Sequence, residues 1–503
     1  SKKAYTNYEA KLKATFTFAS KIPDNQLALM FLEASSLLLK PKGELCFIQK
    51  STSLLYNNKS EEFRRSLFNQ FHVYQIIDFT LLKNVLFKSK NSERTDENGN
   101  VILNKNGTPK KSKATSVESC AVFYKKEKIP EYITLHIISR LLKNTKDGLF
   151  FEFDYYDFNE ISKADILNND IIWRCNLLLG NRLNHLIKRL NVENEYQTSL
   201  KSFLLHNLKL DKKSYGEGYM RGNKNLNDSE IITSYKNLIA KNFNYEDSSL
   251  TEIDRESKFQ WPRNEKYLYK TPLIAIKEEI TKGNIPITFF DEENSQYIPF
   301  DSRILGISFS GVANSKAFFS ILKKTEKINA LKTLATCSQF FLGSSSVIQK
   351  ADIDNWIVPL TEDEIKLSDD EEVVLNDVLN YIFPSWYEGE NALINKHNAS
   401  MIQLKEFGII FNNSFNSIYK KGNKEQRLRK ITEGNDFYAL EFYYGEEDQD
   451  VTKIVTKEEE INTLLRNQIS KNAVINRVIK IYEENKITFL KPKNLRYWLK
   501  STA

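Results

Sequence analysis

The side chains best suited to acid-base or metal chemistry are scattered along this chain. Its five histidines lie in unrelated sequence contexts, so each is interpreted as a structural or surface residue; they are His72, His136, His185, His206 and His397. The four cysteines form no CxxC pair and no Cys/His cluster with metal-ligand spacing; they are Cys46, Cys120, Cys175 and Cys337. We therefore expect no zinc site. Cys46 and Cys120 fall within apolar segments and are predicted to be small core residues.

The common catalytic motifs are also absent from the sequence. It contains no G-x-x-x-x-G-K-[ST] phosphate loop, no G-x-S-x-G turn and no H-E-x-x-H helix. The glycine cluster YGEGYMRGN at 215–223 departs from G-x-G-x-x-G and follows no clear strand, so we predict a loop there. No residue is therefore assigned to cofactor or metal binding from such motifs.

The composition is that of an ordinary globular protein. Of 503 residues, 41% are hydrophobic and 27% charged, and no apolar run approaches the roughly 18 to 20 residues of a membrane span. The wide cysteine spacing and the lack of an apolar secretory signal at the start lead us to expect a reducing cytoplasm. The start has no initiator Met and is interpreted as a cut end. A net charge of +7 permits a polyanionic partner.

The first 130 residues alternate between helix and strand patterns. Apolar residues recur at helical spacing from Leu27 to Leu38, and Pro41 and Gly43 end that helix. Further along, the pattern predicts strands at 44–49, 73–79 and 119–126, a helix from Glu61, and a short segment NVLF at 84–87. This is half of a doubly wound α/β sheet. The first strand is apolar on both faces, as in the interior of a parallel sheet, so we predict that the missing strands lie upstream.

The rest of the chain is predicted to be mixed. The interval 88–116 has seven basic and three acidic residues, and it is interpreted either as a disordered surface loop or as a basic flap on nucleic acid that uses Lys110, Lys111 and Lys113. After the half sheet at 1–130, we expect a linker strand and long helix (helix over 162–190) at 131–194, a strand-richer mixed domain at 195–365, a helical segment at 366–430, and a small α+β extension at 431–503. In that extension a hairpin is predicted over 439–456 and a helix over 461–485.

The first 128 residues resemble a known enzyme group. The segments FLEASSLLLKPKGELCFIQKSTSL, EEFRRSLFNQFHVYQIIDF, NVLF and ESCAVFYKK are similar, in order and spacing, to the catalytic domain of DNA adenine-N6 methyltransferases of the TaqI and type IIG group. The family pattern Ile/Val-x-Pro-x-x-x-Leu falls on 49–54 here, without its Pro. The resemblance implies that Phe87 stacks on the extruded adenine, because an aromatic face offsets part of the few kcal/mol of lost stacking. Alternatively, Phe87 only fills the core after NVLF.

Two motifs of that family are missing from this chain. Neither the glycine-rich turn that binds S-adenosylmethionine nor the Asn-Pro-Pro-aromatic tetrapeptide occurs, and the chain has no Pro-Pro dipeptide at all. The resemblance therefore implies that S-adenosylmethionine is bound by a portion outside this chain. A cleaved upstream portion or a second chain would complete the domain, and this chain alone should be inactive.

The middle of the chain is similar to the target recognition domain of the same enzymes. The resemblance rests on KYLYKTPLIAIKEEITKGNIPITFFDEE and FFLGSSSVIQKADIDNWIVPL, and it implies DNA-facing turns that carry Lys277 and Lys282. YMRGNKN at 219–225 resembles a second contact loop, with Arg221, Asn223 and Lys224 as its DNA-binding residues. Each of these side chains, taken singly, is also typical of a solvated surface.

The hypothesis that follows is a site-specific DNA adenine-N6 methyltransferase of a restriction-modification or phage-defence system, located in the cytoplasm. This chain would supply the base-flipping half of the catalytic domain and the recognition of double-stranded DNA. The fold class is α/β: a partial doubly wound, Rossmann-like methyltransferase sheet, then an α+β recognition domain and a mostly helical C-terminal extension. The alternative is a non-catalytic DNA-recognition or scaffold subunit with a relic methyltransferase fold. A specificity subunit ranks last, because only one recognition domain is found.

Overall fold

The computed structural model describes most of the chain. The described residues are 6–7, 22–23, 26–86, 101, 103, 108–109, 117–145, 148–222, 226–263, 266–280, 283–293, 295–337, 347–360, 365–446, 453–469 and 478–503. The chain divides into two compact units, Ser1–Gly180 with Asn398–Trp498 and Ala503, and Asn181–His397 with Leu499–Thr502. No helix within the described residues is both long and apolar enough to cross a membrane.

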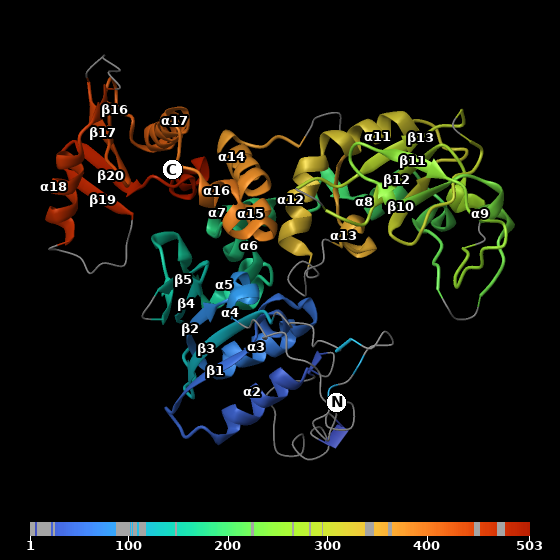
Figure 1. Ribbon diagram of the computed structural model, residues 1–503, viewed down its shortest axis with the longest axis horizontal. Helices are drawn as coiled ribbons and strands as arrows, with labels where there is room; N and C mark the ends of the chain where they lie inside the picture. Colours follow the sequence, from blue (N-terminus) through green and yellow to red (C-terminus); the bar gives the residue numbers. More distant parts are fainter. Residues whose placement is uncertain are drawn as a thin grey trace. The chain divides into compact units, whose positions relative to one another are not determined.

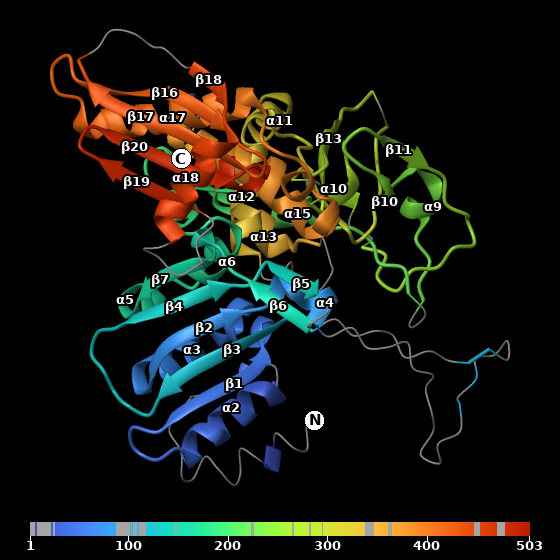
Figure 2. The same cartoon turned by 60° about the vertical axis from the view of Figure 1, so that its left-hand side comes forward.

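A five-stranded sheet organises the first 180 residues, in the order β1-β3-β2-β4-β7 (Figure 2). β3 runs antiparallel to both of its neighbours, so β1 and β2 point the same way, and β2 and β4 are parallel. β7 closes the other side of the sheet antiparallel to β4, and β5 and β6 form a separate two-stranded sheet. The strands are β1 (Glu44–Lys50), β2 (His72–Asp78), β3 (Ser119–Lys125), β4 (Ile133–Ile138), β5 (Leu141–Thr145), β6 (Gly148–Glu152) and β7 (Phe158–Ser162).

Helices cover one face of this sheet next to β1, β2 and β3. Ser36 on α2 (Leu27–Leu38) shares a 2.6 Å hydrogen bond with the hydroxyl of Tyr124, which fixes α2 on the Tyr124 face. Phe71, at the end of α3 (Glu61–Gln70), packs edge-on against the same ring, with 5.3 Å between centroids. These elements confirm the helix and strand pattern that the sequence predicts for this region.

β1 lies at the edge of the first sheet, on the side where the sequence predicts the missing upstream strands. Among the described residues β1 pairs with β3 alone, so it forms the border of the sheet. As a result Cys46, predicted to be a core residue, is exposed, whereas Cys120 on β3 is buried. On α2, Leu29 and Leu32 are fully buried, whereas Phe31 is 63% exposed.

The single helix expected over 162–190 is divided into three. They are α5 (Lys163–Asn168), α6 (Ile172–Leu178) and α7 (Asn181–Leu190). The last break falls at Gly180, whose φ of +81° lies in the left-handed region that a continuing helix cannot use.

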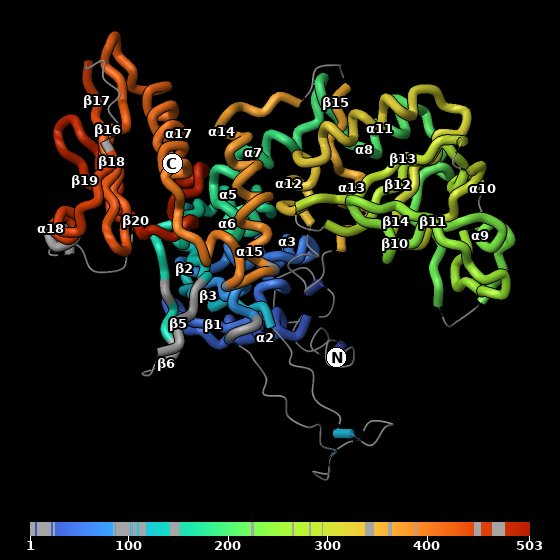
Figure 3. The backbone as a smooth tube through the Cα atoms, turned by 45° about the horizontal axis from the view of Figure 1, so that its top comes forward, coloured from blue at the N-terminus to red at the C-terminus, as the bar shows by residue number. Residues whose placement is uncertain are grey.

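A second five-stranded sheet follows near the C-terminus, in the order β18-β16-β17-β20-β19, with α17 running beside it (Figure 3). Phe411 of α17 packs on Phe442 and Phe489, with ring centroids 4.6 and 4.7 Å away. The elements are α17 (Met401–Tyr419), β16 (Glu425–Glu433), β17 (Phe437–Gly445), β18 (Lys453–Thr456), α18 (Glu458–Ile469), β19 (Ile479–Glu483) and β20 (Lys486–Pro492).

Two sequence predictions for this sheet are wrong. β17 pairs with β16 and β20, while β18 runs parallel to β16, so 439–456 is not a hairpin. The helix expected to reach residue 485 ends at Ile469, and 479–483 is the edge strand β19. Both segments have apolar residues at spacings that suit either pairing, and the sheet and α17 decide between them.

The second unit is richer in short strands (Figure 1). Its largest sheet has the order β13-β12-β14-β9, with central β12 antiparallel to both neighbours and its Leu273, Ile274 and Ile276 fully buried. The strands are β8 (Gln197–Ser199), β9 (Tyr215–Glu217), β10 (Asn237–Phe243), β11 (Ser248–Thr251), β12 (Leu273–Lys277), β13 (Ile287–Phe290), β14 (Ile304–Ser308) and β15 (Ile357–Pro359). The helices are α7, α8 (Leu200–Ser202), α9 (Glu230–Ser234), α10 (Lys266–Tyr269), α11 (Ser315–Lys324), α12 (Glu326–Thr336), α13 (Lys350–Asp354), α14 (Asp369–Asp377), α15 (Phe383–Glu388) and α16 (Leu393–Lys396).

Candidate functional site at the carboxyl edge of the first sheet

The carboxyl ends of three strands meet at one edge of the first sheet. Lys50, the last residue of β1, pairs with Ser119, and Asp78, the last residue of β2, pairs with Cys120 and with Ile138 at the end of β4. Ligand sites of open α/β sheets lie outside the carboxyl ends of the strands. This edge is therefore the candidate site of the first unit.

A buried carboxylate, that of Asp78, lies at the centre of this edge. Thr80 donates two hydrogen bonds to Asp78 Oδ1, from its backbone N–H at 2.9 Å and from its hydroxyl at 2.6 Å. The hydroxyl of Tyr56 donates to the other oxygen, and the hydroxyl of Ser51 lies 2.5 Å from that of Thr80. Asp78 is fully buried, so these donors replace the water that a carboxylate needs. They tie the chain after β1 to the chain after β2.

His136 approaches the same carboxylate from β4. Its Nε2 atom is 3.5 Å from Asp78 Oδ2, and its Nδ1 atom is 3.4 Å from the amide of Asn176. The ring packs edge-on against Trp173, with 5.1 Å between centroids. The sequence interpretation of His136 as structural did not foresee this cluster, because residue 136 meets residues 78, 173 and 176 only in the folded sheet.

The electrostatics of this edge keep the Tyr56 hydroxyl and the Cys120 thiol protonated. Burial raises the pKa of the Tyr56 hydroxyl well above its usual value, and the charge of Asp78 raises it further. Burial followed by the same charge also raises the pKa of the Cys120 thiol well above normal. Both groups therefore stay neutral near pH 7 and act here as hydrogen-bond donors or packing groups, not as nucleophiles.

Two buried arginines fix the turn that follows β1. The turn is a π-helical segment, Thr52–Tyr56, and Arg64 donates to the carbonyl oxygens of Leu54 and Asn57, at 2.5 and 2.9 Å. Arg174 donates to the carbonyl of Tyr56 at 3.0 Å. Burial and then repulsion from Arg174 lower the pKa of Arg64 to about 9, which leaves it charged at neutral pH.

The chain after β2 is also held by buried partners, like the turn after β1. Phe79 donates its backbone N–H to the carbonyl of Ser119 at 2.9 Å, and Lys83 forms a 3.1 Å ion pair with the buried Glu118. α4 (Lys83–Leu86) follows directly, and Phe87 is the next residue in the sequence. Phe87 itself lies outside the described residues.

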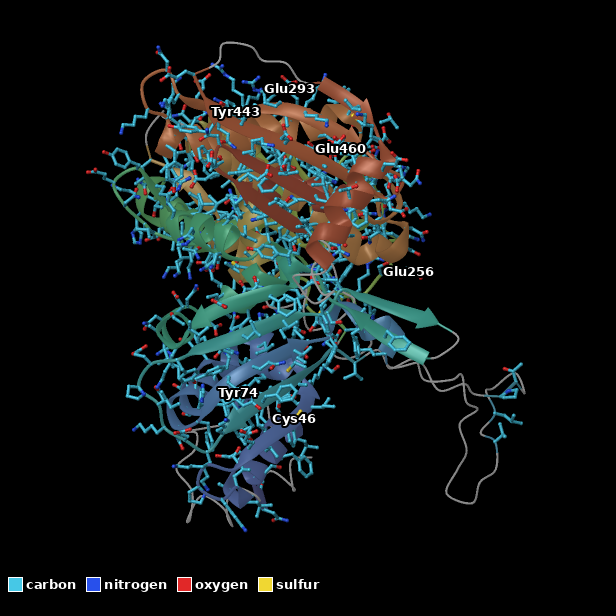
Figure 4. All side chains as sticks on the ribbon, turned by 90° about the vertical axis from the view of Figure 1, so that its left-hand side faces the viewer. Cys46, Tyr74, Glu256, Glu293, Tyr443 and Glu460 are labelled. Atoms are coloured by element: carbon cyan, nitrogen blue, oxygen red, sulfur yellow. The ribbon has the colours of Figure 1, made fainter. Side chains whose placement is uncertain are left out.

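One face of the first sheet carries apolar side chains that solvent reaches. Cys46 pairs with Phe123 across β1 and β3, on the side opposite Tyr124, and Tyr74 packs against Phe123 with 6.3 Å between ring centroids. Ile48 on the same face is 65% exposed. We name these four residues, Cys46, Ile48, Tyr74 and Phe123, the open face; Figure 4 looks onto it, with Cys46 and Tyr74 labelled.

Most of the DNA-binding residues expected from the sequence cannot be located. Besides Phe87, the residues outside the described part of the chain are Lys110, Lys111, Lys113, Asn223, Lys224 and Lys282. Arg221 and Lys277 are described. Arg221 is exposed, whereas Lys277 is half-buried and forms a 2.8 Å ion pair with Glu279, which competes with any phosphate contact.

Arg221 and Lys277 lie at the same end of the β13-β12-β14-β9 sheet. Lys277 pairs with Ile304, the first residue of β14, and Gly218 donates to the carbonyl of that same Ile304 at 3.2 Å. A Cβ at Gly218 would sit 1.8 Å from the carbonyl oxygen of Phe300, so only glycine lets the 219–222 loop pass here. The exposed Arg303, which the sequence reasoning missed, directly precedes β14 at this end. Its place at this end follows from the order of the strands in the sheet and not from the local sequence.

Part of the first unit, including residues of the candidate site, matches a known protein family. Residues 2–87 match the Eco57I restriction-modification methylase family. The methylase-like segment contains α2, β1, α3 and β2, and with them Ser51, Asp78 and Thr80 of the buried network. It covers less than a fifth of the chain. Comparison with curated protein sequences finds no significant match.

Comparison with solved structures finds weak similarity to restriction-modification enzymes. The type IIL enzyme MmeI in complex with DNA is 9% identical, with 83% of this chain and 48% of that chain covered and a TM-score of 0.29. The nuclease-deletion mutant of the type ISP enzyme LlaGI, with a DNA substrate mimic, is 11% identical, with 99% and 44% covered and a TM-score of 0.26. A DrdV–DNA complex is 11% identical, with 60% and 33% covered and a TM-score of 0.22. The chain spans less than half of each structure, and TM-scores this low do not establish a shared fold.

Proposed function

We propose that this chain is part of a site-specific DNA adenine-N6 methyltransferase of a restriction-modification or phage-defence system. The observation that carries the proposal is the family match over 2–87, which falls on the strands whose carboxyl ends build the buried Asp78 network. In this proposal the first sheet is half of a doubly wound methyltransferase sheet, acting in the cytoplasm on double-stranded DNA. The sheet supports the proposal, because β3 is inserted antiparallel between the parallel strands β1 and β2.

Base flipping is assigned to Phe87. A base-modifying enzyme extrudes its target at a cost of a few kcal/mol, and an aromatic face offsets part of that cost. The chain reaches Phe87 from a turn that Thr80, Phe79 and Lys83 anchor to buried partners. An anchored approach supports this role, since a stacking residue must be held in place before the base arrives.

S-adenosylmethionine, which supplies the methyl group in such enzymes, does not fit the residues of this chain. The glycine-rich turn that would hold it is absent from the sequence, and Gly43, the glycine nearest β1, lies at the amino end of that strand. We therefore assign the cofactor and the amino-polarising tetrapeptide to a segment upstream of β1 or to a second chain.

Among the described residues no strand lies on the outer side of β1, and this border and the open face support that assignment. Ile48 on β1 is 65% exposed, and Phe31 on the adjoining α2 is 63% exposed. An unpaired strand edge flanked by large apolar side chains is unfavourable in water and invites pairing. The occupant we propose is the half-domain that carries the cofactor site, with its strand next to β1 and a helix over the open face.

DNA recognition is assigned to the second unit and to the basic interval before β3. Arg221 and Arg303 at one end of the β12 sheet would contact phosphates, with Lys277 beside them. Lys282, Asn223 and Lys224 are proposed from the sequence as contacts near this end. Lys110, Lys111 and Lys113 are proposed as contacts from the basic interval.

The test is co-expression of this chain with the coding sequence directly upstream of it. The pair is incubated with tritiated S-adenosylmethionine and unmethylated bacteriophage DNA, and the nucleosides are then separated to identify the methylated base. We expect label in N6-methyladenine with the pair and none with this chain alone. Ile48→Asp should abolish incorporation, whereas Ile454→Asp, a matched change at a 47% exposed isoleucine of β18, should not.

Two results would contradict the proposal. Label in a cytosine product would overturn the adenine assignment. DNA binding by the pair with no incorporation at all would favour the alternative, a DNA-recognition or scaffold subunit with a relic methyltransferase fold.

A further inference from the structure

A cleft in the second unit lies apart from the residues assigned above. It has a volume of about 380 Å³ and opens between the end of α7, the short β8 and β15 pair, and α12. Its walls carry Leu190, Val192, Glu193, Thr198, Lys332 and Asn355, among others. Pockets for small molecules range over roughly 300–1,000 Å³, so this one can hold a compact metabolite.

The walls of the cleft are rigidly held. Asn329 of α12 donates to the carbonyl of Ile357 at 3.1 Å and accepts from its N–H at 2.7 Å, which joins α12 to β15. Trp356 donates its indole N–H to the hydroxyl of Thr333 at 3.0 Å. These bonds are buried, so the cleft is formed before any ligand enters.

Lys332 is the unusual residue in this cleft. Its side chain projects from α12 into the lining and is only 8% exposed, and among the described residues its ammonium has no hydrogen-bond or ion-pair partner. The side chain of Lys332 is mostly buried, so its charge at the wall of the cleft is poorly solvated, and an anion in the cleft would give that charge a partner. Thr336, one turn further along α12, bonds the carbonyl of Lys332 at 2.9 Å instead of the ammonium.

Glu193 supplies a second, opposite charge at the exposed side of the cleft. Its Oε1 atom accepts from the backbone N–H of Ser199 at 2.8 Å and from the hydroxyl of Thr198 at 3.4 Å. These bonds hold the carboxylate and lower its pKa. Glu193 makes no direct ion pair with Lys332 within the described part of the chain, so the two charges face the same space from different walls.

We propose that this cleft binds a small phosphate monoester with a hydroxylated body, such as a sugar phosphate or nucleoside monophosphate. The ammonium of Lys332 pairs with the phosphate, and the carboxylate of Glu193 accepts from a hydroxyl of the sugar. A DNA backbone is a poorer match, because backbone phosphates are met by exposed Lys and Arg side chains, whereas this lysine is recessed.

The test is calorimetric titration of the purified chain with ribose 5-phosphate and, in parallel, with inorganic phosphate. We expect saturable binding, tighter for ribose 5-phosphate because only it can reach Glu193. Lys332→Met should weaken binding by about 10- to 100-fold, the worth of one charge-assisted hydrogen bond. Lys327→Met removes an exposed charge from the same helix and should leave binding unchanged. Glu193→Gln should remove the preference for the sugar phosphate.

A pH series on the unmodified chain gives a second readout that does not depend on a variant folding. Burial lowers the pKa of Lys332 to about 8, so the ammonium loses its proton as the pH rises through that value. Phosphate affinity should therefore rise as the phosphate loses its second proton near pH 6, peak near pH 7, and fall as the pH rises through about 8. Absence of saturable binding, equal binding by Lys332→Met, or a flat pH profile would each overturn the site. Displacement of ribose 5-phosphate by duplex DNA would assign the cleft to the DNA backbone instead and overturn the choice of ligand.

Discussion

The buried network around Asp78 gives the sharpest prediction, through the substitution Thr80→Val. Thr80 is 6% exposed and its hydroxyl donates to Asp78 at 2.6 Å, so the hydroxyl of Ser51, 2.5 Å away, must donate to Thr80. Valine has nearly the same shape but makes neither bond. A hydrogen bond to a charged group is worth about 1.5–3 kcal/mol, and the orphaned hydroxyl of Ser51 costs about 1 kcal/mol more. The expected loss is about 3 kcal/mol.

The assay is amide hydrogen exchange of peptides that cover 72–86 and 119–125, read by mass spectrometry. Because each 1.4 kcal/mol is a factor of ten, protection in these peptides should fall by about 100-fold. Exchange is preferred to global unfolding because the chain contains two units and need not unfold in one step. Peptides from β16 and β17 serve as an internal reference.

Two further variants decide whether the reasoning is right. In the double variant Ser51→Ala with Thr80→Val, no hydroxyl is left orphaned, so about 1 kcal/mol of the loss should return. Thr463→Val makes the same chemical change at an exposed threonine of α18 and should cost less than about 0.5 kcal/mol. A fall in protection below about threefold for Thr80→Val, or no recovery in the double variant, would refute this account of the network.

Three other outcomes are expected. Arg64→Met removes the donors to the carbonyls of Leu54 and Asn57. Cleavage within 52–57 by a protease other than trypsin should therefore accelerate by at least about tenfold, and equal rates would show that the turn is stable without these hydrogen bonds. Arg221→Gln should reduce the slope of log affinity against log salt for duplex DNA by about 1 without changing stability; an unchanged slope would remove Arg221 from the interface. Cys46 should be the cysteine that a maleimide labels, because the other three are buried. Burial raises the pKa of Cys46, so its labelling rate near neutral pH should be below that of a free thiol and should approach the free-thiol rate as the pH rises. Binding of the upstream half-domain should block the labelling.

The sequence by itself determined the local elements of the first sheet. Periodic apolar residues, the Pro41 and Gly43 stop and the alternation of helix and strand patterns were enough to predict α2, β1, α3, β2 and β3, because these signals act over a few residues. The same reading failed for β18 and β19, where the apolar spacing suits more than one pairing and long-range contacts choose between them.

The tertiary structure decided what those elements do together. Asp78, Thr80 and Ser51 are ordinary polar residues in the sequence, and they became one buried network only when β1 and β2 ended at the same edge. Lys332 and Glu193 are far apart along the chain, and the fold brings α12 and the segment between α7 and β8 to one cleft. The physical reason is that burial and charge pairing depend on neighbours distant in sequence, whereas helix and strand periodicity depends on neighbours a few residues away.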